Sequence, residues 1–212
     1  MVLGPCDSVS NIMIQHEDIW VTGVFDGYKH SGIAVYYGDY DPRTRYAPYN
    51  AIDKLKPNSM STLRAHYMAM HEALRGLEQE IEEDRCRGPA RIHSESDCVA
   101  ECVDEFFRRR KRSGTKTNWG KNRPIARAII RQLGTVSKYY KNRGWPPLAF
   151  VEEMGLYAEE MQKADGLACY AMLEMERGSK EMFHCLINED DSDDDDELLS
   201  DIAGLTIDDK ST

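Results

Sequence analysis

A basic segment with interleaved aromatic residues holds the side chains best suited to a charged ligand. From Asp104 to Arg143 there are thirteen Lys and Arg residues and two acidic ones, a local charge of +11. Lys and Arg neutralise phosphates and aromatic rings lie against sugars or bases, so the segment predicts contact with nucleic acid. A solvated charged face is the alternative, and Arg108–Arg112 also has the composition of a nuclear import signal. The residues expected at the nucleic acid are Arg109, Lys116, Trp119, Lys121 and Arg123.

The end of the chain has the opposite charge. The 212 residues contain 27 Lys and Arg against 37 Asp and Glu, a net charge of −10, and all of this excess lies in residues 189–212. Such a stretch buries too little apolar surface to fold alone, so we expect a disordered acidic tail. We expect it to compete with nucleic acid for the basic segment. Its apolar residues between Leu198 and Leu205 are alternatively a surface for a protein partner.

Short strands and amphipathic helices precede this tail. Runs of β-branched and aromatic residues that end in turn signals predict strands, and apolar residues recurring every three to four positions predict helices. Pro48 places the third strand at a sheet edge. The expected strands are 19–25, 32–37, 45–50, 90–95 and 148–151, and the expected helices are 61–84, 96–106, 124–142 and 161–172.

The order of these elements predicts an α/β fold. Three closely spaced strands favour an antiparallel meander, and the later strands return through helices as β-α-β crossovers. We therefore expect one five-stranded mixed sheet with helices on both faces. The expected organisation is an irregular N-terminus over residues 1–16, one domain over 17–178, and a linker with the acidic tail over 179–212.

Four short motifs stand at the ends of these elements. They are Phe25-Asp26-Gly27 at the end of the first strand, Ser61-Thr62-Leu63-Arg64-Ala65-His66 at the start of the first helix, Ser94-Glu95-Ser96 after the fourth strand and Ala164-Asp165-Gly166-Leu167-Ala168 in the last helix. Together with the order of the elements, these motifs resemble the type 1 ribonuclease H family between about Ile19 and Met172. The resemblance implies an RNase H-like fold and, as partner, an RNA/DNA hybrid or RNA.

The resemblance also implies a chemistry for these motifs. In the family, carboxylates at such places hold two divalent cations that activate a water and stabilise the leaving oxygen of a phosphodiester. Mg²⁺ is the natural ion for oxygen ligands, and Mn²⁺ is the alternative. By resemblance, Asp26, Glu95 and Asp165 are the metal ligands and, with His66, the catalytic residues. The implied activity is metal-dependent endonucleolytic cleavage of the RNA strand of a hybrid.

Two departures from the family pattern support a second hypothesis. His66 stands where the family has a Glu, and imidazole is a poor ligand for Mg²⁺. The family's His-containing loop before the last helix is not recognisable, because 154–157 reads Met-Gly-Leu-Tyr. The alternative is therefore an inactive pseudo-nuclease that serves as a nucleic-acid or protein interaction module.

The sequence also predicts where the protein works. No apolar run approaches the roughly 20 residues of a membrane span, and the first residues lack the pattern of a signal peptide. The six cysteines form no CxxC pair, which is typical of reduced thiols. We expect a monomeric cytoplasmic or nuclear protein without a membrane partner.

Overall fold

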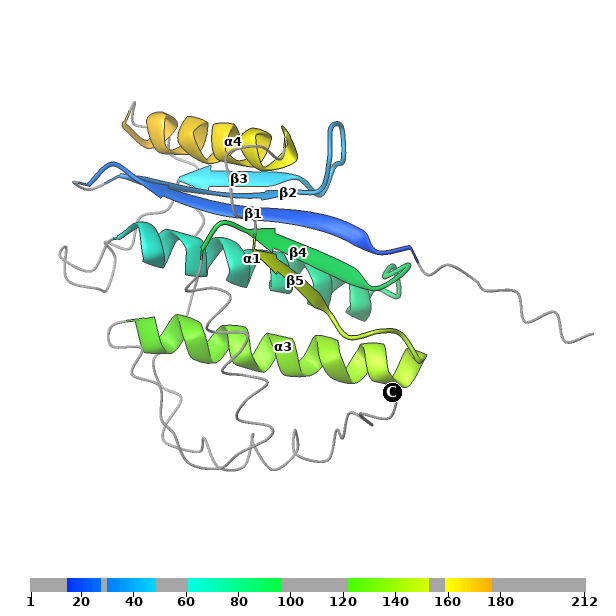
Figure 1. The fold of residues 1–212 in the computed structure, drawn as a ribbon. Helices are drawn as coiled ribbons and strands as arrows, with labels where there is room; N and C mark the ends of the chain where they lie inside the picture. The colour runs from blue at the N-terminus through cyan, green and yellow to red at the C-terminus, as the bar shows by residue number, and fades with distance from the viewer. Residues whose placement is uncertain (1–14, 28–29, 49–60, 97–121, 153–158, 177–212) are drawn as a thin grey trace, which may run out of the picture.

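The computed structural model describes residues 15–27, 30–48, 61–96, 122–152 and 159–176 (Figure 1). Four of the five predicted strands and three of the four predicted helices lie within these stretches, as does the strand expected at 45–50 except for residues 49–50. The helix expected at 96–106 beyond Ser96, the part of the basic segment up to residue 121 and the acidic tail lie outside the described residues. The elements are β1 (Glu17–Phe25), β2 (Ser31–Tyr36), β3 (Arg45–Pro48), α1 (Thr62–Glu82), β4 (Ala90–Ser94), α3 (Arg123–Arg143), β5 (Ala149–Glu152) and α4 (Glu159–Glu176).

The five strands form one mixed sheet in the order β3-β2-β1-β4-β5. β1, β2 and β3 pair antiparallel, as the predicted meander requires. β4 pairs parallel with β1, and β5 pairs parallel with β4, so the later strands return by crossovers. β3 is an edge strand and ends at Pro48, which agrees with the expectation for that proline. The predicted fold class is therefore confirmed.

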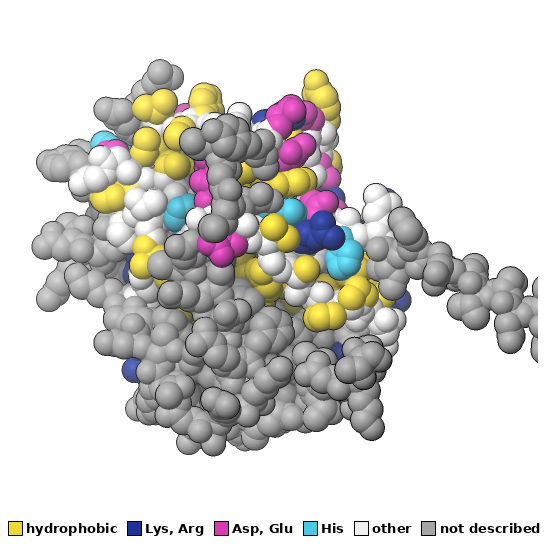
Figure 2. Space-filling model, viewed as in Figure 1, with side chains coloured by type: hydrophobic (Ala, Val, Ile, Leu, Met, Phe, Trp, Pro, Cys, Tyr) yellow, Lys and Arg dark blue, Asp and Glu magenta, His cyan; other side chains and the backbone are white. Residues whose placement is uncertain are grey.

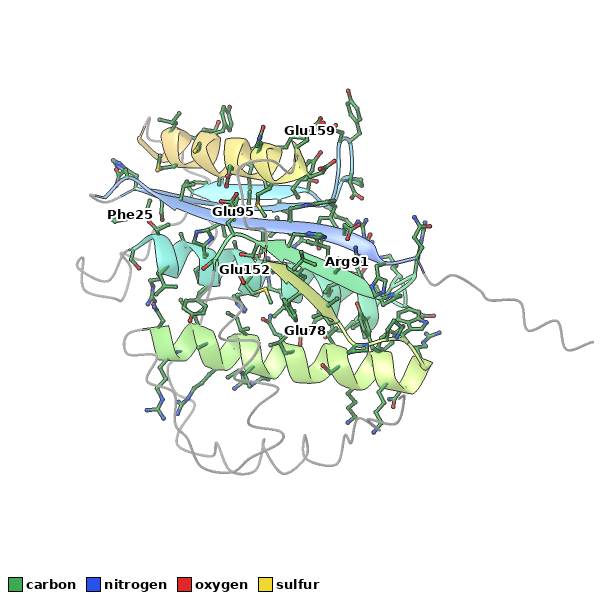
Figure 3. The ribbon with its side chains drawn as sticks, viewed as in Figure 1. Phe25, Glu78, Arg91, Glu95, Glu152 and Glu159 are labelled. Atoms are coloured by element: carbon green, nitrogen blue, oxygen red, sulfur yellow. The ribbon has the colours of Figure 1, made fainter. Side chains whose placement is uncertain are left out.

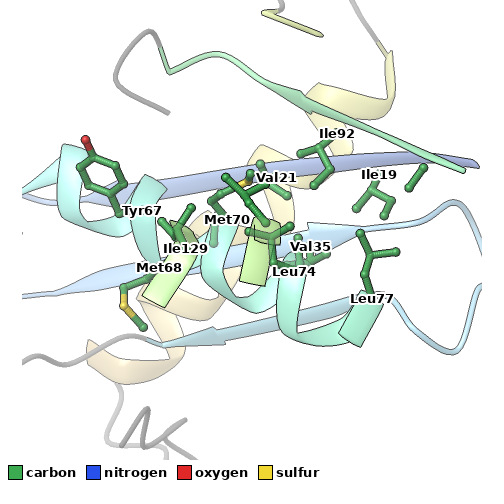
Figure 4. Close-up of a cluster of buried hydrophobic side chains, with 14 of the residues drawn as sticks. Ile19, Val21, Val35, Tyr67, Met68, Met70, Leu74, Leu77, Ile92 and Ile129 are labelled. Atoms are coloured by element: carbon green, nitrogen blue, oxygen red, sulfur yellow. The ribbon is translucent and has the colours of Figure 1, made fainter. Parts of the chain in front are cut away.

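Helices cover both faces of the sheet (Figure 1). α4 lies on one face against β1, β2 and β3, whereas α1 lies on the other face, with α3 packed beyond it. The main core fills the space between the sheet and α1, where Val21, Met70, Leu74 and Ile129 are fully buried (Figure 4). Burying a side chain of this size contributes roughly 1.5–3 kcal/mol, so this layer holds α1 firmly on the sheet.

Local signals set the ends of the two long helices. At the start of α1, Oγ of Ser61 accepts a hydrogen bond of 3.2 Å from the N–H of Arg64. α3 has Pro124 in its first turn and ends at Gly144, whose φ of 68° lies in the left-handed region that terminates helices. None of the described helices combines the length and the apolar character needed to cross a membrane.

Candidate functional site

The carboxyl-terminal ends of β1 and β4 lie at the same edge of the sheet because the two strands are parallel. Their last pair is Trp20 opposite His93, and continuing this register by two residues places Glu95 level with Thr22. Glu95 is exposed, and Figure 3 shows it near Glu152 at the ends of the neighbouring strands β4 and β5. Acidic side chains therefore gather at this end of the sheet.

Thr22 links β1 to α4 at this end. The residue is 1% exposed, and its Oγ1 donates a hydrogen bond of 2.6 Å to Oδ1 of Asp165. Asp165 is half-buried and follows the fully buried Ala164 on the side of α4 that packs on the sheet. An O–H···O bond this short to a carboxylate belongs to the strong, charge-assisted class, so it fixes the Asp165 side chain against β1.

His66 reaches the same region from α1. Gly23 lets β1 approach that helix, because a Cβ at this position would lie 2.3 Å from the carbonyl carbon of Ala65 and 2.6 Å from the His66 nitrogen. Nδ1 of His66 is buried and has no hydrogen-bond partner among the described atoms. Burial lowers the pKa of His66 below 6.5, and the negative charge of Asp165 opposes this only in part. Burial therefore disfavours the charged imidazolium form of His66.

Asp26 lies apart from these residues. It follows β1, four positions beyond Thr22, which is about 13 Å along an extended strand. Its carboxylate accepts a hydrogen bond of 3.1 Å from the backbone N–H of His30 and lies 2.7 Å from Nδ1 of the His30 ring. The structure thus brings Thr22, rather than Asp26, to Asp165.

Thr22 is not among the residues that the sequence predicts for the site, although one signal points to it. Thr22 is followed by Gly23 inside the strand, whereas Asp26 is followed by Gly27, whose φ of 80° already belongs to the turn. The side chain of a residue inside a strand has a defined face of the sheet, whereas one beyond its end does not. A choice based on position within the strand would have selected Thr22.

The donors at this end of the sheet do not fit a pair of Mg²⁺ ions. Mg²⁺ takes oxygen ligands in near-octahedral geometry, and two ions need several carboxylates between them. Glu95, Glu152 and Asp165 are carboxylates, but the residue on β1 is a hydroxyl that donates to Asp165 and the residue on α1 is the imidazole of His66. Within the described stretches, no group of three or more His, Cys, Asp or Glu side chains could hold a metal ion.

A second charged feature lies on α3, which has six basic residues and no acidic one. At about 100° per residue, five of the six fall within an arc of roughly 80° and span about 27 Å along the axis. The buried face of the helix, which includes Ile129 and Leu133, lies on the opposite side. The sixth basic residue, Arg143, lies outside the arc and pairs with Asp84 at 2.8 Å. We call the five residues of the arc the α3 stripe: Arg123, Arg127, Arg131, Lys138 and Lys141.

The α3 stripe extends the nucleic-acid surface that the sequence predicts. Arg123, the first residue of α3, is exposed and begins the stripe. Arg131, Lys138 and Lys141 are also exposed, and Arg127 is half-buried. Arg127, Arg131, Lys138 and Lys141 also lie within the basic segment. Their helical spacing was the signal in the sequence that would have identified them as contact residues. The other predicted contacts lie outside the described residues: Arg109, Lys116, Trp119 and Lys121.

The α4 side of the molecule has a different character. Figure 2 shows apolar and acidic side chains gathered over α4 and the neighbouring turn between β2 and β3. Tyr46 and Tyr170 are exposed there with ring centroids 5.7 Å apart, and Asp39 pairs with Lys163 at 2.7 Å. Because phosphates are attracted to the basic side of a protein, α3 is the better candidate for a nucleic-acid interface.

Comparison with known proteins identifies the fold. No protein-family profile matches the sequence, and no curated protein matches it. The foamy viral protease-reverse transcriptase in complex with dsDNA is similar at 16% identity over 74% of this chain and 94% of that chain, with a TM-score of 0.50. LC11-RNase H1 in complex with RNA/DNA hybrid is similar at 17% identity over 74% and 97% of the two chains, with a TM-score of 0.45. The chain has an RNase H-like fold, as its motifs predicted.

Proposed function

We propose that this protein binds an RNA/DNA hybrid or structured RNA as an RNase H-like module and does not cleave it. The observation that carries this proposal is the α3 stripe, five basic residues on one side of a helix that has no acidic residue. The foamy viral structure of similar fold was solved with dsDNA, which supports a duplex as the ligand. The motif resemblance to type 1 ribonuclease H favours a hybrid among duplexes.

The dimensions of the α3 stripe suit a nucleic-acid backbone. Its length of about 27 Å corresponds to roughly eight nucleotides of one strand, at one phosphate per about 3.4 Å of duplex axis. Cations along this length displace condensed counterions, which supplies affinity without sequence preference. Selectivity for RNA would come from contacts to 2′-hydroxyl groups in the minor groove.

The side chains on β1 and α1 support a protein that does not cleave its ligand. Two-metal hydrolysis needs carboxylates around both ions, and Thr22 and His66 do not supply them. Cleavage with Mg²⁺ or Mn²⁺ is the second candidate function. It is favoured by the retention of Glu95 and Asp165, which come from separate elements at one end of the sheet.

One experiment separates these candidates. The full chain and an Asp165→Asn variant are incubated with a labelled RNA/DNA hybrid, and with dsRNA and dsDNA of the same sequence, in Mg²⁺, Mn²⁺ or EDTA. Fluorescence anisotropy reports binding, and a denaturing gel reports cleavage. We expect both proteins to bind the hybrid in all three conditions and to leave the RNA strand intact. Cleavage by the wild type that Asp165→Asn abolishes would establish the hydrolase, and failure to bind any duplex would refute both candidates.

A further inference from the structure

The hydrogen bond between Thr22 and Asp165 is a feature that nucleic-acid binding through α3 does not explain. It joins two residues 143 positions apart in the sequence, one on the central strand β1 and one on α4. We propose that this bond replaces a divalent cation, so that the Thr22 hydroxyl occupies the place where an ion would otherwise join β1 to α4. The inference rests on the proposed non-cleaving function and specifies which contact makes a metal ion unnecessary at this site.

The Asp165 carboxylate occupies a half-buried position on α4. The Thr22 hydroxyl satisfies its Oδ1 with a neutral donor at 2.6 Å, and no positive charge is required. A carboxylate in place of the hydroxyl would lie about 3 Å from that of Asp165. Two carboxylates this close cannot both stay ionised without a proton or a cation between them. The residue at position 22 therefore decides whether this contact demands a cation.

His66 approaches Asp165 from α1. An imidazole carries no negative charge in either protonation state, so His66 adds none that a cation would balance. Its position is restricted, since Gly23 packs directly against the Ala65–His66 backbone. Neither the residue that approaches Asp165 from the sheet nor the one from α1 thus brings a negative charge. The site is stable without an ion, and an arriving ion would have to compete with the Thr22 hydroxyl for Oδ1 of Asp165.

The test uses Mn²⁺ as the probe, with binding measured by electron paramagnetic resonance and melting temperature measured in EDTA and in Mg²⁺. We expect the wild type to show no saturable Mn²⁺ binding and the same melting temperature in both conditions. Thr22→Asp should melt several degrees lower in EDTA and recover in Mg²⁺. Thr22→Asp combined with His66→Glu should bind Mn²⁺ saturably. Thr22→Val is the matched control, because it removes the donor without adding charge and should melt lower by the same amount in EDTA and in Mg²⁺.

Two results would overturn the inference. One is saturable Mn²⁺ binding by the wild type that Asp165→Asn abolishes. The other is a Thr22→Asp protein that is folded by circular dichroism but whose melting temperature does not respond to Mg²⁺. If Thr22→Asp folds neither in EDTA nor in Mg²⁺, the wild type and Thr22→Val decide the question. The proposal requires that the melting temperature of each be the same in EDTA and in Mg²⁺. Hybrid affinity is measured separately by anisotropy. Failure of the proposed function would appear as a lack of hybrid binding, whereas failure of this inference would appear in Mn²⁺ binding and in the melting temperatures.

Discussion

The salt dependence of hybrid binding is the sharpest test of the α3 stripe. Each phosphate neutralised by a basic residue contributes about −0.9 to the slope of log affinity against log salt concentration. If all five stripe residues contact phosphates, they contribute about −4.5 to this slope. The affinity that they supply then falls roughly 500-fold between 50 and 200 mM salt. Arg131→Gln combined with Lys138→Gln removes two central, exposed cations of the stripe. We expect the slope to become shallower by about 1.8.

The measurement is an anisotropy titration of a labelled hybrid at several KCl concentrations, compared between the wild type and this double variant. Lys163→Gln combined with Arg85→Gln is the matched control, because it makes the same change in net charge away from the stripe. Lys163 lies on α4 beside Asp39, and Arg85 pairs with Glu83 after α1. An equal change of slope in both double variants would show that only net charge matters. That result would refute the reasoning, as would an unchanged slope in the stripe variant.

Three further predictions concern single residues. Tyr140→Phe should lower the free energy of unfolding by about 1–3 kcal/mol in a urea titration, because the buried N–H of Ala90 loses the Tyr140 hydroxyl that accepts its hydrogen bond at 2.9 Å. Burial raises the pKa of Glu78 above 4.5, so the fold loses stability as pH rises through that pKa; Glu78→Gln should melt higher than the wild type at pH 7 and no higher below pH 4.5. Asp26→Asn should leave both hybrid affinity, measured by anisotropy, and Mn²⁺ binding, measured by electron paramagnetic resonance, unchanged, because Asp26 lies beyond the end of β1. A change in either quantity would place Asp26 at the site.

The fold was predictable because each element carries its own local signal. The three-to-four spacing of apolar residues such as Met70, Leu74 and Leu77 specifies the buried face of α1, whatever the sheet beneath it looks like. Short runs separated by turn residues likewise predict a meander before any pairing is known. These signals require only neighbours in sequence, and the observed bounds of the two long helices agree with the predicted ones to within two residues.

The site was less predictable because it depends on register. Whether position 22 or position 26 of the chain faces Asp165 is decided by how far α4 lies along β1, and that distance is set by packing between segments far apart in sequence. Gly32 shows the constraint: a Cβ there would lie 2.0 Å from the Ala168 carbonyl oxygen, so only glycine lets β2 and α4 pack this closely at that position. An Asp-Gly pair in the sequence carries no information on that contact. The Asp26-Gly27 pair indicates the turn after β1, whereas its role as a metal ligand was implied only by the family resemblance.

Neither the Thr22 hydroxyl nor the His66 imidazole carries negative charge, so neither would repel a hybrid that extended from α3 to this end of the sheet. In a two-metal nuclease, carboxylates near the substrate are tolerated because the cations between them reverse the local charge. Without those cations, each carboxylate repels the phosphate backbone of the nucleic acid, and at about 0.15 M salt this repulsion acts over roughly 8 Å. Thr22→Asp should therefore weaken hybrid binding in EDTA and regain affinity in Mg²⁺, whereas Thr22→Val should bind as the wild type does in both. Equal weakening by both variants would instead attribute the effect to a displaced α4 rather than to charge.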